Sequence, residues 1–318
     1  MLLSSGGFAI YRGFLPIYKI LIPRFGSMKS RANREKILAT WLRSKGFRRT
    51  GLEPEQLSSR LLNECQTGGD FIRIVMDSVA QHQNVNRWAV YDPDNVLHVQ
   101  RVKRDIPNAL FVHIVRDGRD IALSLKKMGG FAPLPWDRSE TNSLVATALY
   151  WEWMVHRGRA AGQQFAKDYV EIRYEDLIMN PRETLAKLGG FIDHDLDYDR
   201  IQRAGLGRLS ETNSSFREEG GVEKLNPLGR WKERLSPANV AAIEGAVGSC
   251  LEENGYPLSL PAGERRMSPR ASWMRSMYPA FLGSKLWLKL HTPVGRLANI
   301  SALELAEEPL PAAESARS

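Results

Sequence analysis

Residue types suited to binding a phosphate group follow an apolar run in the middle of the chain. Arg116 directly follows the β-branched run 111–115, and Ser124 lies two turns into the helical pattern that comes next. A guanidinium and a hydroxyl near a helix start, where free N–H groups and the helix dipole favour negative charge, suit a phosphate dianion. The structural alternative is that Asp117 or Asp120 caps the helix and the arginines pair with neighbouring acids.

Three further motifs follow this one along the chain. Tyr174 comes directly after the apolar run 169–173 and is followed by Glu-Asp-Leu and Asn-Pro. Phe216 ends an Asn-Ser-Ser-Phe motif, and Arg230 lies in a Gly-Arg-Trp-Lys motif. Each motif alone is a weak signal, whereas the four in this order are specific.

Short apolar runs separated by helical patterns indicate an α/β chain. The runs predicted to be strands are 88–91, 111–115 and 169–173. Helices are predicted at 30–45, 54–66, 69–83, 95–105, after Arg116, at 143–165, from Pro181 and at 236–254. Strands that alternate with helices favour a parallel sheet, and ligands of such sheets bind at the carboxyl ends of the strands.

Composition and charge describe an ordinary globular chain with anionic partners. The 318 residues are 43% hydrophobic and 25% charged, with a formal net charge of +8. No RNA-binding aromatic signature or zinc-finger spacing points to nucleic acid. Cys65 and Cys250 are too few for a disulfide framework or, by themselves, a zinc site, so we expect a cytoplasmic setting and no metal.

The end of the chain differs from the rest in composition. Basic and aromatic residues alternate through 264–298, which is typical of a segment that lies on an anionic membrane surface. The alternative is a helix packed on the core with a solvated basic face. Residues 301–318 are rich in Ala, Pro and Glu and are predicted to be disordered. We therefore expect a domain at 1–260, an extension at 261–300 and a tail at 301–318.

The four motifs together resemble the sulfotransferase family, whose members take sulfuryl groups from 3′-phosphoadenosine 5′-phosphosulfate (PAPS). The resemblance covers roughly residues 85–256. It implies an α/β fold, a P-loop NTPase-like three-layer parallel sheet with helices on both faces. It also implies transfer to a hydroxyl or amine of a small-molecule, lipid or glycan acceptor. We expect no nucleic-acid partner.

The resemblance also implies roles for the matching residues. Arg116 and Ser124 correspond to the arginine and serine that hold the 3′-phosphate. Tyr174 corresponds to the tyrosine that reaches the adenine, and Phe216 to the aromatic residue that covers the adenine ring. Lys224 and Arg230 fall at or near the family's second phosphate-contacting loop.

Two features of the family pattern are not reproduced. The family's Arg-Lys-Gly upstream of Gly229 is replaced by Lys224-Leu225-Asn226, so Lys224 is only a candidate for binding the 3′-phosphate. No stretch similar to the Pro-Arg-Ser-Gly-Thr-Thr loop, which binds the 5′-phosphosulfate in the family, occurs in this sequence. We therefore expect an N-terminally truncated chain that is inactive as written. Asp92 and His98 are candidates for the general base, but both residue types are more often structural, so no catalytic residue is assigned.

Two other functions compete with sulfuryl transfer. One is a catalytically inactive protein that binds 3′-phosphoadenosine and lacks the phosphosulfate loop. The other, a peripheral membrane or nucleic-acid-binding protein, rests on net charge alone.

Overall fold

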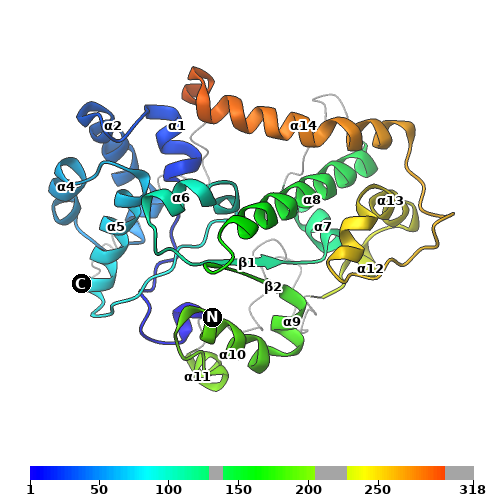
Figure 1. The fold of residues 1–318 in the computed structure, drawn as a ribbon, viewed down its shortest axis with the longest axis horizontal. Helices are drawn as coiled ribbons and strands as arrows, with labels where there is room; N and C mark the ends of the chain where they lie inside the picture. Colours follow the sequence, from blue (N-terminus) through cyan, green and yellow to red (C-terminus); the bar gives the residue numbers. More distant parts are fainter. Residues whose placement is uncertain (129–138, 205–227, 298–318) are drawn as a thin grey trace, which may run out of the picture. The chain divides into compact units, whose positions relative to one another are not determined.

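The computed structural model describes residues 1–128, 139–204 and 228–297. These residues form two compact units, labelled by their elements in Figure 1. The first comprises Met1–Ala109 and the described residues from Trp287 onward, and the second comprises Leu110–Leu286. The domain boundary expected near residue 260 stays a prediction.

The first unit is built from helices around a buried aromatic cluster. The Trp41 ring packs edge-on against Phe47 and Phe71, with centroid distances of 5.3 and 5.1 Å. Thr67 and Asp70 form a capping box that fixes where the longest helix of this unit begins. The helices of the unit are α1 (Ile22–Phe25), α2 (Arg31–Leu42), α3 (Lys45–Arg48), α4 (Pro54–Asn63), α5 (Gly68–His82) and α6 (Val99–Asp105). Further short elements are the 3₁₀ turns η1 (Leu2–Ser4), η3 (Pro93–Leu97) and η5 (Pro293–Leu297) and the π-helix η2 (Ile17–Leu21).

The strand predicted at 88–91 is not formed. The described backbone makes one isolated parallel bridge just before it, between Phe8 and Arg87, where the Ala9 N–H donates to the Arg87 carbonyl at 2.7 Å. A short apolar run becomes a strand only when a neighbouring segment supplies a continuous hydrogen-bond ladder. At this place the described residues supply the bridge alone, so the prediction was wrong.

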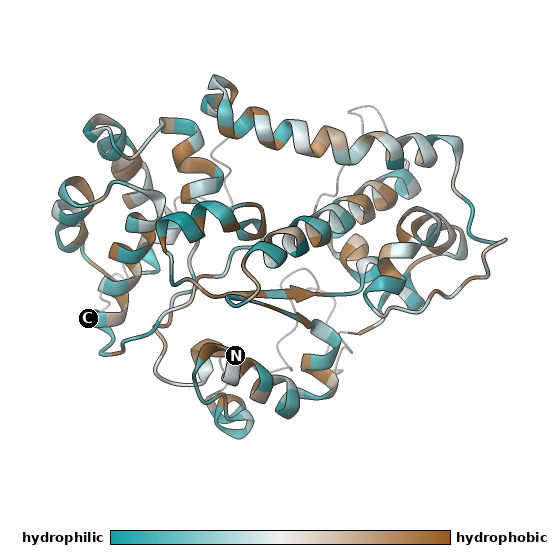
Figure 2. Cartoon of the chain, in the orientation of Figure 1, coloured by the Kyte–Doolittle hydropathy of each residue, from teal (hydrophilic) through white to brown (hydrophobic). Residues whose placement is uncertain are grey.

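The second unit contains a parallel pair of strands, as the sequence predicts. Strands β1 (Phe111–Val115) and β2 (Tyr169–Arg173) pair in parallel, with Phe111 opposite Tyr169 and Val115 opposite Arg173. In Figure 1 the pair lies between α8 and α10, and Figure 2 shows the apolar character of β1. The described residues therefore form a mixed α/β fold with a small parallel sheet. Both strands end at the same edge, which places the residues that follow them side by side.

Helices of the second unit surround this pair. They are α7 (Gly118–Lys127), α8 (Glu140–Gln164), α9 (Tyr174–Met179), α10 (Pro181–Ile192), α11 (Tyr198–Ala204), α12 (Trp231–Arg234), α13 (Pro237–Glu253) and α14 (Pro269–His291), whose last turn falls in the first unit. Val115, Ala122 and Trp231 belong to one apolar core with much of α8 and α13. None of the described helices is long and apolar enough to cross a bilayer.

Gly118 permits a close approach between α7 and α8. A Cβ at this residue would lie 2.6 Å from Cε3 of Trp151, a distance no side chain tolerates. The same indole donates its Nε1–H to the Arg116 carbonyl at 3.0 Å. The hydrogen bond from Trp151 therefore holds the turn after β1, and Gly118 leaves the space that the indole ring needs.

Replacing Gly118 tests this contact. Gly118→Ala should lower the free energy of unfolding by about 1–3 kcal/mol because the helices must move apart to admit the methyl group. Gly190→Ala is the matched control, since nothing lies within 4 Å of its Cβ position in α10, and a gain of up to about 1 kcal/mol is expected there. Urea denaturation measures both. Equal stability of Gly118→Ala and the parent would contradict the argument.

Candidate functional site

Arg116 and Tyr174 meet at the carboxyl ends of the two strands. Arg116 follows the last residue of β1, and Tyr174 follows the last residue of β2. The Arg116 guanidinium carbon lies 4.9 Å from the centroid of the Tyr174 ring, a cation–π contact. Two residues that are far apart in the sequence are thus brought together by the register of the sheet.

Asp120 connects this pair to the start of α12. Its carboxylate accepts from Arg116 Nη2 at 3.1 Å and from the Gly229 N–H at 3.0 Å. The other oxygen accepts from the Trp231 N–H at 3.0 Å. The side chain of Asp120 is only 1% exposed, so these bonds satisfy oxygens that water does not reach. They place Arg230, the residue between the two amides, beside Arg116.

Two guanidiniums, those of Arg116 and Arg230, lie close together at the site. Arg230 is buried, and its burial together with the nearby Arg116 lowers the pKa of its guanidinium. Asp120 and Tyr174 act in the opposite direction. Burial is the largest cause of the shift, and repulsion by Arg116 adds to it. An anion bound here would relieve that repulsion.

Arg119, in the same turn, has a structural role. Its guanidinium donates to both oxygens of Asp117, at 3.0 and 2.8 Å, and to Glu244 at 2.6 Å. It also lies 3.9 Å from the centroid of the Trp231 ring. Asp117 in addition caps α7 by accepting from the Arg119 N–H. The structural alternative is therefore correct for Asp117 and Arg119 and for the pairing of Arg116 with Asp120, and Trp231 is buried.

The structure brings together Arg116, Tyr174 and Arg230 among the predicted site residues. Ser124 lies buried on α7, one turn after Asp120 and on the same helix face. Phe216 and Lys224 lie outside the described residues. Sequence reasoning treated Asp120 only as a possible cap or partner of an arginine. Asp120 follows Arg116 by four residues, and this spacing is the feature of the sequence that could have indicated the ion pair between them.

The candidates for the general base lie in the first unit. The Asp92 carboxylate accepts from the Asp94 N–H at 2.9 Å and so caps η3. His98 is 3% exposed, and burial, reinforced by Arg101, lowers its pKa to about 4. Both observations agree with the structural roles expected for these residues. Their use in a reaction stays untested.

His113, on β1, has hydrogen-bond partners on β2. Its Nδ1 lies 3.1 Å from Oε2 of Glu171 and 2.6 Å from the Tyr169 hydroxyl. Both ring contacts come from the paired strand, so His113 has a structural role between β1 and β2.

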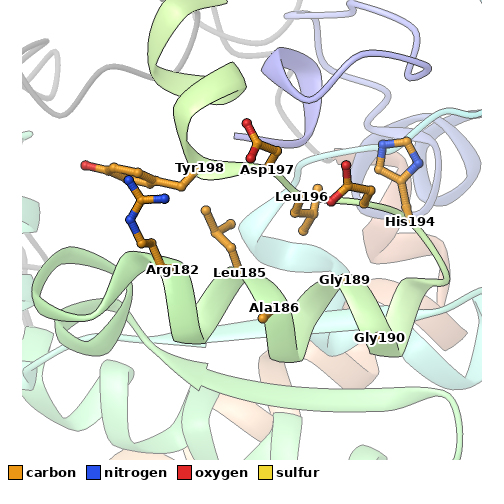
Figure 3. A pocket seen from close by; sticks show the side chains of 10 residues that line it. Arg182, Leu185, Ala186, Gly189, Gly190, His194, Leu196, Asp197 and Tyr198 are labelled. Atoms are coloured by element: carbon orange, nitrogen blue, oxygen red, sulfur yellow. The ribbon is translucent and has the colours of Figure 1, made fainter.

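A separate surface hollow of about 360 Å³ lies along α10. Its lining comes from α10 and the segment that leads into α11, and Figure 3 shows Arg182 and Tyr198 side by side at one end. The Arg182 guanidinium lies 4.9 Å from the Tyr198 ring centroid and pairs with Asp199. None of the described site residues lines this hollow, so it does not belong to the cluster around Asp120.

Fold and site together define an α/β protein with a cationic site at the carboxyl ends of its parallel strands. A family model described as "Sulfotransferase family" matches residues 18–198, more than half of the chain. The chain therefore belongs to the sulfotransferase family. The matched span includes Arg116 and Tyr174 and ends before Arg230.

Individual relatives are similar over different spans. Sulfotransferase 1B1 of Mus musculus is 26% identical over 97 residues, which cover 29% of this chain and 32% of that protein. The chain thus spans about a third of the length of this curated relative. The sulfotransferase domain of the Synechococcus PCC 7002 olefin synthase has 17% identity and a TM-score of 0.49, covering 82% of this chain and 89% of that one. The sulfotransferase domain of the curacin biosynthetic pathway has 14% identity and a TM-score of 0.43, covering 87% and 90%.

The buried imidazole of His98 predicts a loss of stability in mild acid. The unfolded chain binds a proton near pH 6.5, whereas the folded chain binds it only near pH 4. Stability should therefore fall as the pH drops from 6.5 towards 4. Between pH 7 and pH 5 this one group accounts for a loss of about 2 kcal/mol.

Urea unfolding of His98→Gln at pH 7 and pH 5 measures this contribution. The variant should lose about 2 kcal/mol less than the parent between the two pH values, whatever its stability at pH 7. His82→Gln, which alters an exposed histidine at the end of α5, is the matched control and should keep the parental pH dependence. An unchanged pH dependence in His98→Gln would show that the imidazole already titrates normally in the folded chain.

Proposed function

We propose that this chain supplies the nucleotide site of a sulfotransferase, which takes a sulfuryl group from PAPS and delivers it to a hydroxyl or amine acceptor. The observation that carries the proposal is the cluster of Arg116, Tyr174 and Arg230 around Asp120. The family to which the chain belongs supports the same activity. In this proposal β1 and β2 are part of a P-loop-like three-layer sheet.

The chemistry of the cluster suits the 3′-phosphoadenosine end of the donor. A phosphate dianion neutralises the two guanidiniums better than a monoanion does, and Arg116 presents a planar fork of donors. The N-terminus of α7 adds backbone N–H groups and a positive dipole end close to the same place. Tyr174 supplies an aromatic ring next to the charge, as an adenine nucleotide requires.

The remaining predicted residues take supporting roles in this proposal. Ser124 supplies a hydroxyl to the 3′-phosphate from the face of α7 that carries Asp120. Phe216 covers the adenine, and Lys224 adds a further cation to the phosphate. PAPS supplies the sulfuryl group when bound, and the described residues fix its nucleotide end. Binding of the nucleotide without transfer is expected of the chain as written, and an inactive 3′-phosphoadenosine-binding protein would behave in the same way.

The C-terminal helix supports contact with a membrane surface, the second part of the proposal. One face of α14 is buried, through Ala271, Met274, Tyr278 and Leu282. The neighbouring face, about 100° round the helix, carries a second apolar stripe at a spacing of four residues, in which Trp273, Met277 and Phe281 are 51–55% exposed. The apolar surface of α14 is therefore wider than the face that it buries. The second stripe, flanked by basic residues, matches an interfacial helix on anionic lipid and favours a lipid acceptor.

Arg116→Ala tests the nucleotide site. The variant should bind adenosine 3′,5′-bisphosphate about 10- to 100-fold more weakly, since charge-assisted hydrogen bonds of about 1.5–3 kcal/mol are lost. Affinity for adenosine 5′-monophosphate should stay nearly unchanged, because that ligand lacks the 3′-phosphate. Isothermal titration calorimetry measures both ligands. Arg182→Ala, at an exposed ion pair outside the cluster, is the control and should bind both ligands as the parent does.

Two results would overturn the assignment of the phosphate to Arg116. One is an Arg116→Ala variant that keeps the parental preference for the 3′-phosphorylated ligand. The other is an equal loss of affinity for both nucleotides, which would mean that the substitution only disturbs the fold. Arg116→Lys separates these cases, since it keeps a positive charge beside Asp120 and should retain part of the selectivity.

Vesicle sedimentation tests the membrane surface. The parent should sediment with phosphatidylserine-containing vesicles, and Trp273→Ser, Met277→Ser and Phe281→Ser combined should weaken that binding at least about tenfold. Met179→Ser removes a similarly exposed apolar side chain outside α14 and should have no effect. A parent that stays in the supernatant, or a triple variant that sediments like the parent, would refute the membrane proposal.

A further inference from the structure

Three side chains with metal-binding atoms converge between α8 and α13. They are His156 on α8 and Cys250 and Glu253 on α13, and one donor atom from each lies within 4.8 Å of the other two. All three belong to the second unit, so their proximity depends only on the packing of these two helices. None of them belongs to the cluster around Asp120.

Helix geometry explains why the donors share one place. Cys250 and Glu253 are three residues apart and therefore lie on one face of α13. Glu152 and His156 are four residues apart on α8, and Glu152 is near enough to act electrostatically on His156, Glu253 and Cys250. The shared apolar core of α8 and α13 holds these two faces together. Metal sites of helical bundles are built in the same way, from side chains at short spacing on facing helices.

We propose that His156, Cys250 and Glu253 bind a zinc ion. Zn²⁺ accepts sulfur, nitrogen and oxygen donors together, in a tetrahedral arrangement. Donor atoms around such an ion are about 3.6 Å apart, given metal–ligand distances of about 2.0–2.3 Å. His156 and Glu253 are exposed, so a change of side-chain rotamer brings their atoms that much closer to the buried sulfur. Water completes the shell, because Glu152 already pairs with Arg275 at 3.6 Å.

The surroundings of Cys250 favour this ion over ordinary packing of a thiol. The residue is 1% exposed, yet its sulfur faces an imidazole and a carboxylate rather than apolar side chains alone. The Asn254 amide lies 3.5 Å from the sulfur, a weak donor position that suits a metal-bound thiolate. Arg159 fixes that amide by donating to its oxygen at 2.7 Å. Zinc binding releases the thiol proton, and the thiolate and Glu253 then balance the charge of the ion.

The proposed ion joins the two helices that support the nucleotide cluster. α13 also carries Glu244, the buried partner of Arg119, and α8 carries Trp151, which donates to the Arg116 carbonyl. A metal that binds the folded chain alone stabilises it by mass action. The role is structural and independent of sulfuryl transfer. It departs from the expectation of a chain without metal.

Spectroscopy with Co²⁺ in place of Zn²⁺ tests the ligand set in the full, untagged chain. One equivalent of Co²⁺ should produce a thiolate-to-cobalt charge-transfer absorption in the near ultraviolet. This band should persist in Cys65→Ser, which removes the other cysteine, and disappear in Cys250→Ser. Excess Zn²⁺ should bleach the band. A missing band in the parent, or an undiminished band in Cys250→Ser, would overturn the site.

Substitutions at the two exposed ligands give a second test, because a misfolded Cys250→Ser would also lose the band. His156→Gln and Glu253→Gln should each weaken Zn²⁺ binding at least about 100-fold in calorimetry, more than loss of an outer-shell partner does. Both should abolish the rise in melting temperature that Zn²⁺ gives the parent. Glu252→Gln, the exposed neighbour on α13, should behave as the parent. Parental zinc affinity in both variants would refute the proposal.

Discussion

The buried carboxylate of Asp120 is the constraint from which the geometry of the site follows. An ionised group at 1% exposure is costly unless its oxygens are hydrogen-bonded, and Asp120 has donors from Arg116, Gly229 and Trp231. Two of these donors are backbone amides that belong to a segment far along the chain. The chain must therefore return to the first turn of α7 at residues 229–231, and Arg230 lies beside Arg116 as a result.

The second layer of the site consists of further buried carboxylates that hold the turn itself. Glu175 accepts from the Asp117 N–H at 3.0 Å and from the Tyr256 hydroxyl at 2.8 Å. Glu244 accepts from Arg119 and from the backbone N–H groups of Ser259 and Leu260. Such groups fix backbone positions because each lost partner would leave a buried charge unpaired. A turn held in this way presents its exposed donors in one defined arrangement.

Much of this arrangement was predictable from the sequence, and the exceptions have a common physical cause. The runs 111–115 and 169–173 are predicted as strands and found as strands, and the residues directly after them, Arg116 and Tyr174, meet as expected. Local patterns of period two and of helical spacing carry that information. The run 88–91 has the composition of a strand but lacks a ladder partner among the described residues, and composition cannot report a partner.

Local sequence patterns could not predict contacts between distant segments either, because they do not report which segments become neighbours in the fold. Nothing in the spacing of Cys250 and Glu253 reveals that His156 lies opposite them, because that depends on how α13 packs against α8. The partners of Asp120 on the 229–231 segment were hidden in the same way. In contrast, the pairing of Arg116 with Asp120 joins two residues four positions apart and was part of the structural alternative for that turn.

Two arginines of one turn show how burial and charge balance separate a structural role from a binding role. The Arg119 side chain is 2% exposed and faces two carboxylates, those of Asp117 and Glu244, so its charge is more than compensated. Arg116, at 13% exposure, pairs with Asp120, which also accepts from two backbone amides, and Arg230 lies near enough for the two guanidiniums to repel each other. Arg119 is thus enclosed by carboxylates, whereas Arg116 and Arg230 lie together beside the ring of Tyr174. Because these two cations lie at the carboxyl ends of two parallel strands, an anionic ligand would reduce their mutual repulsion there.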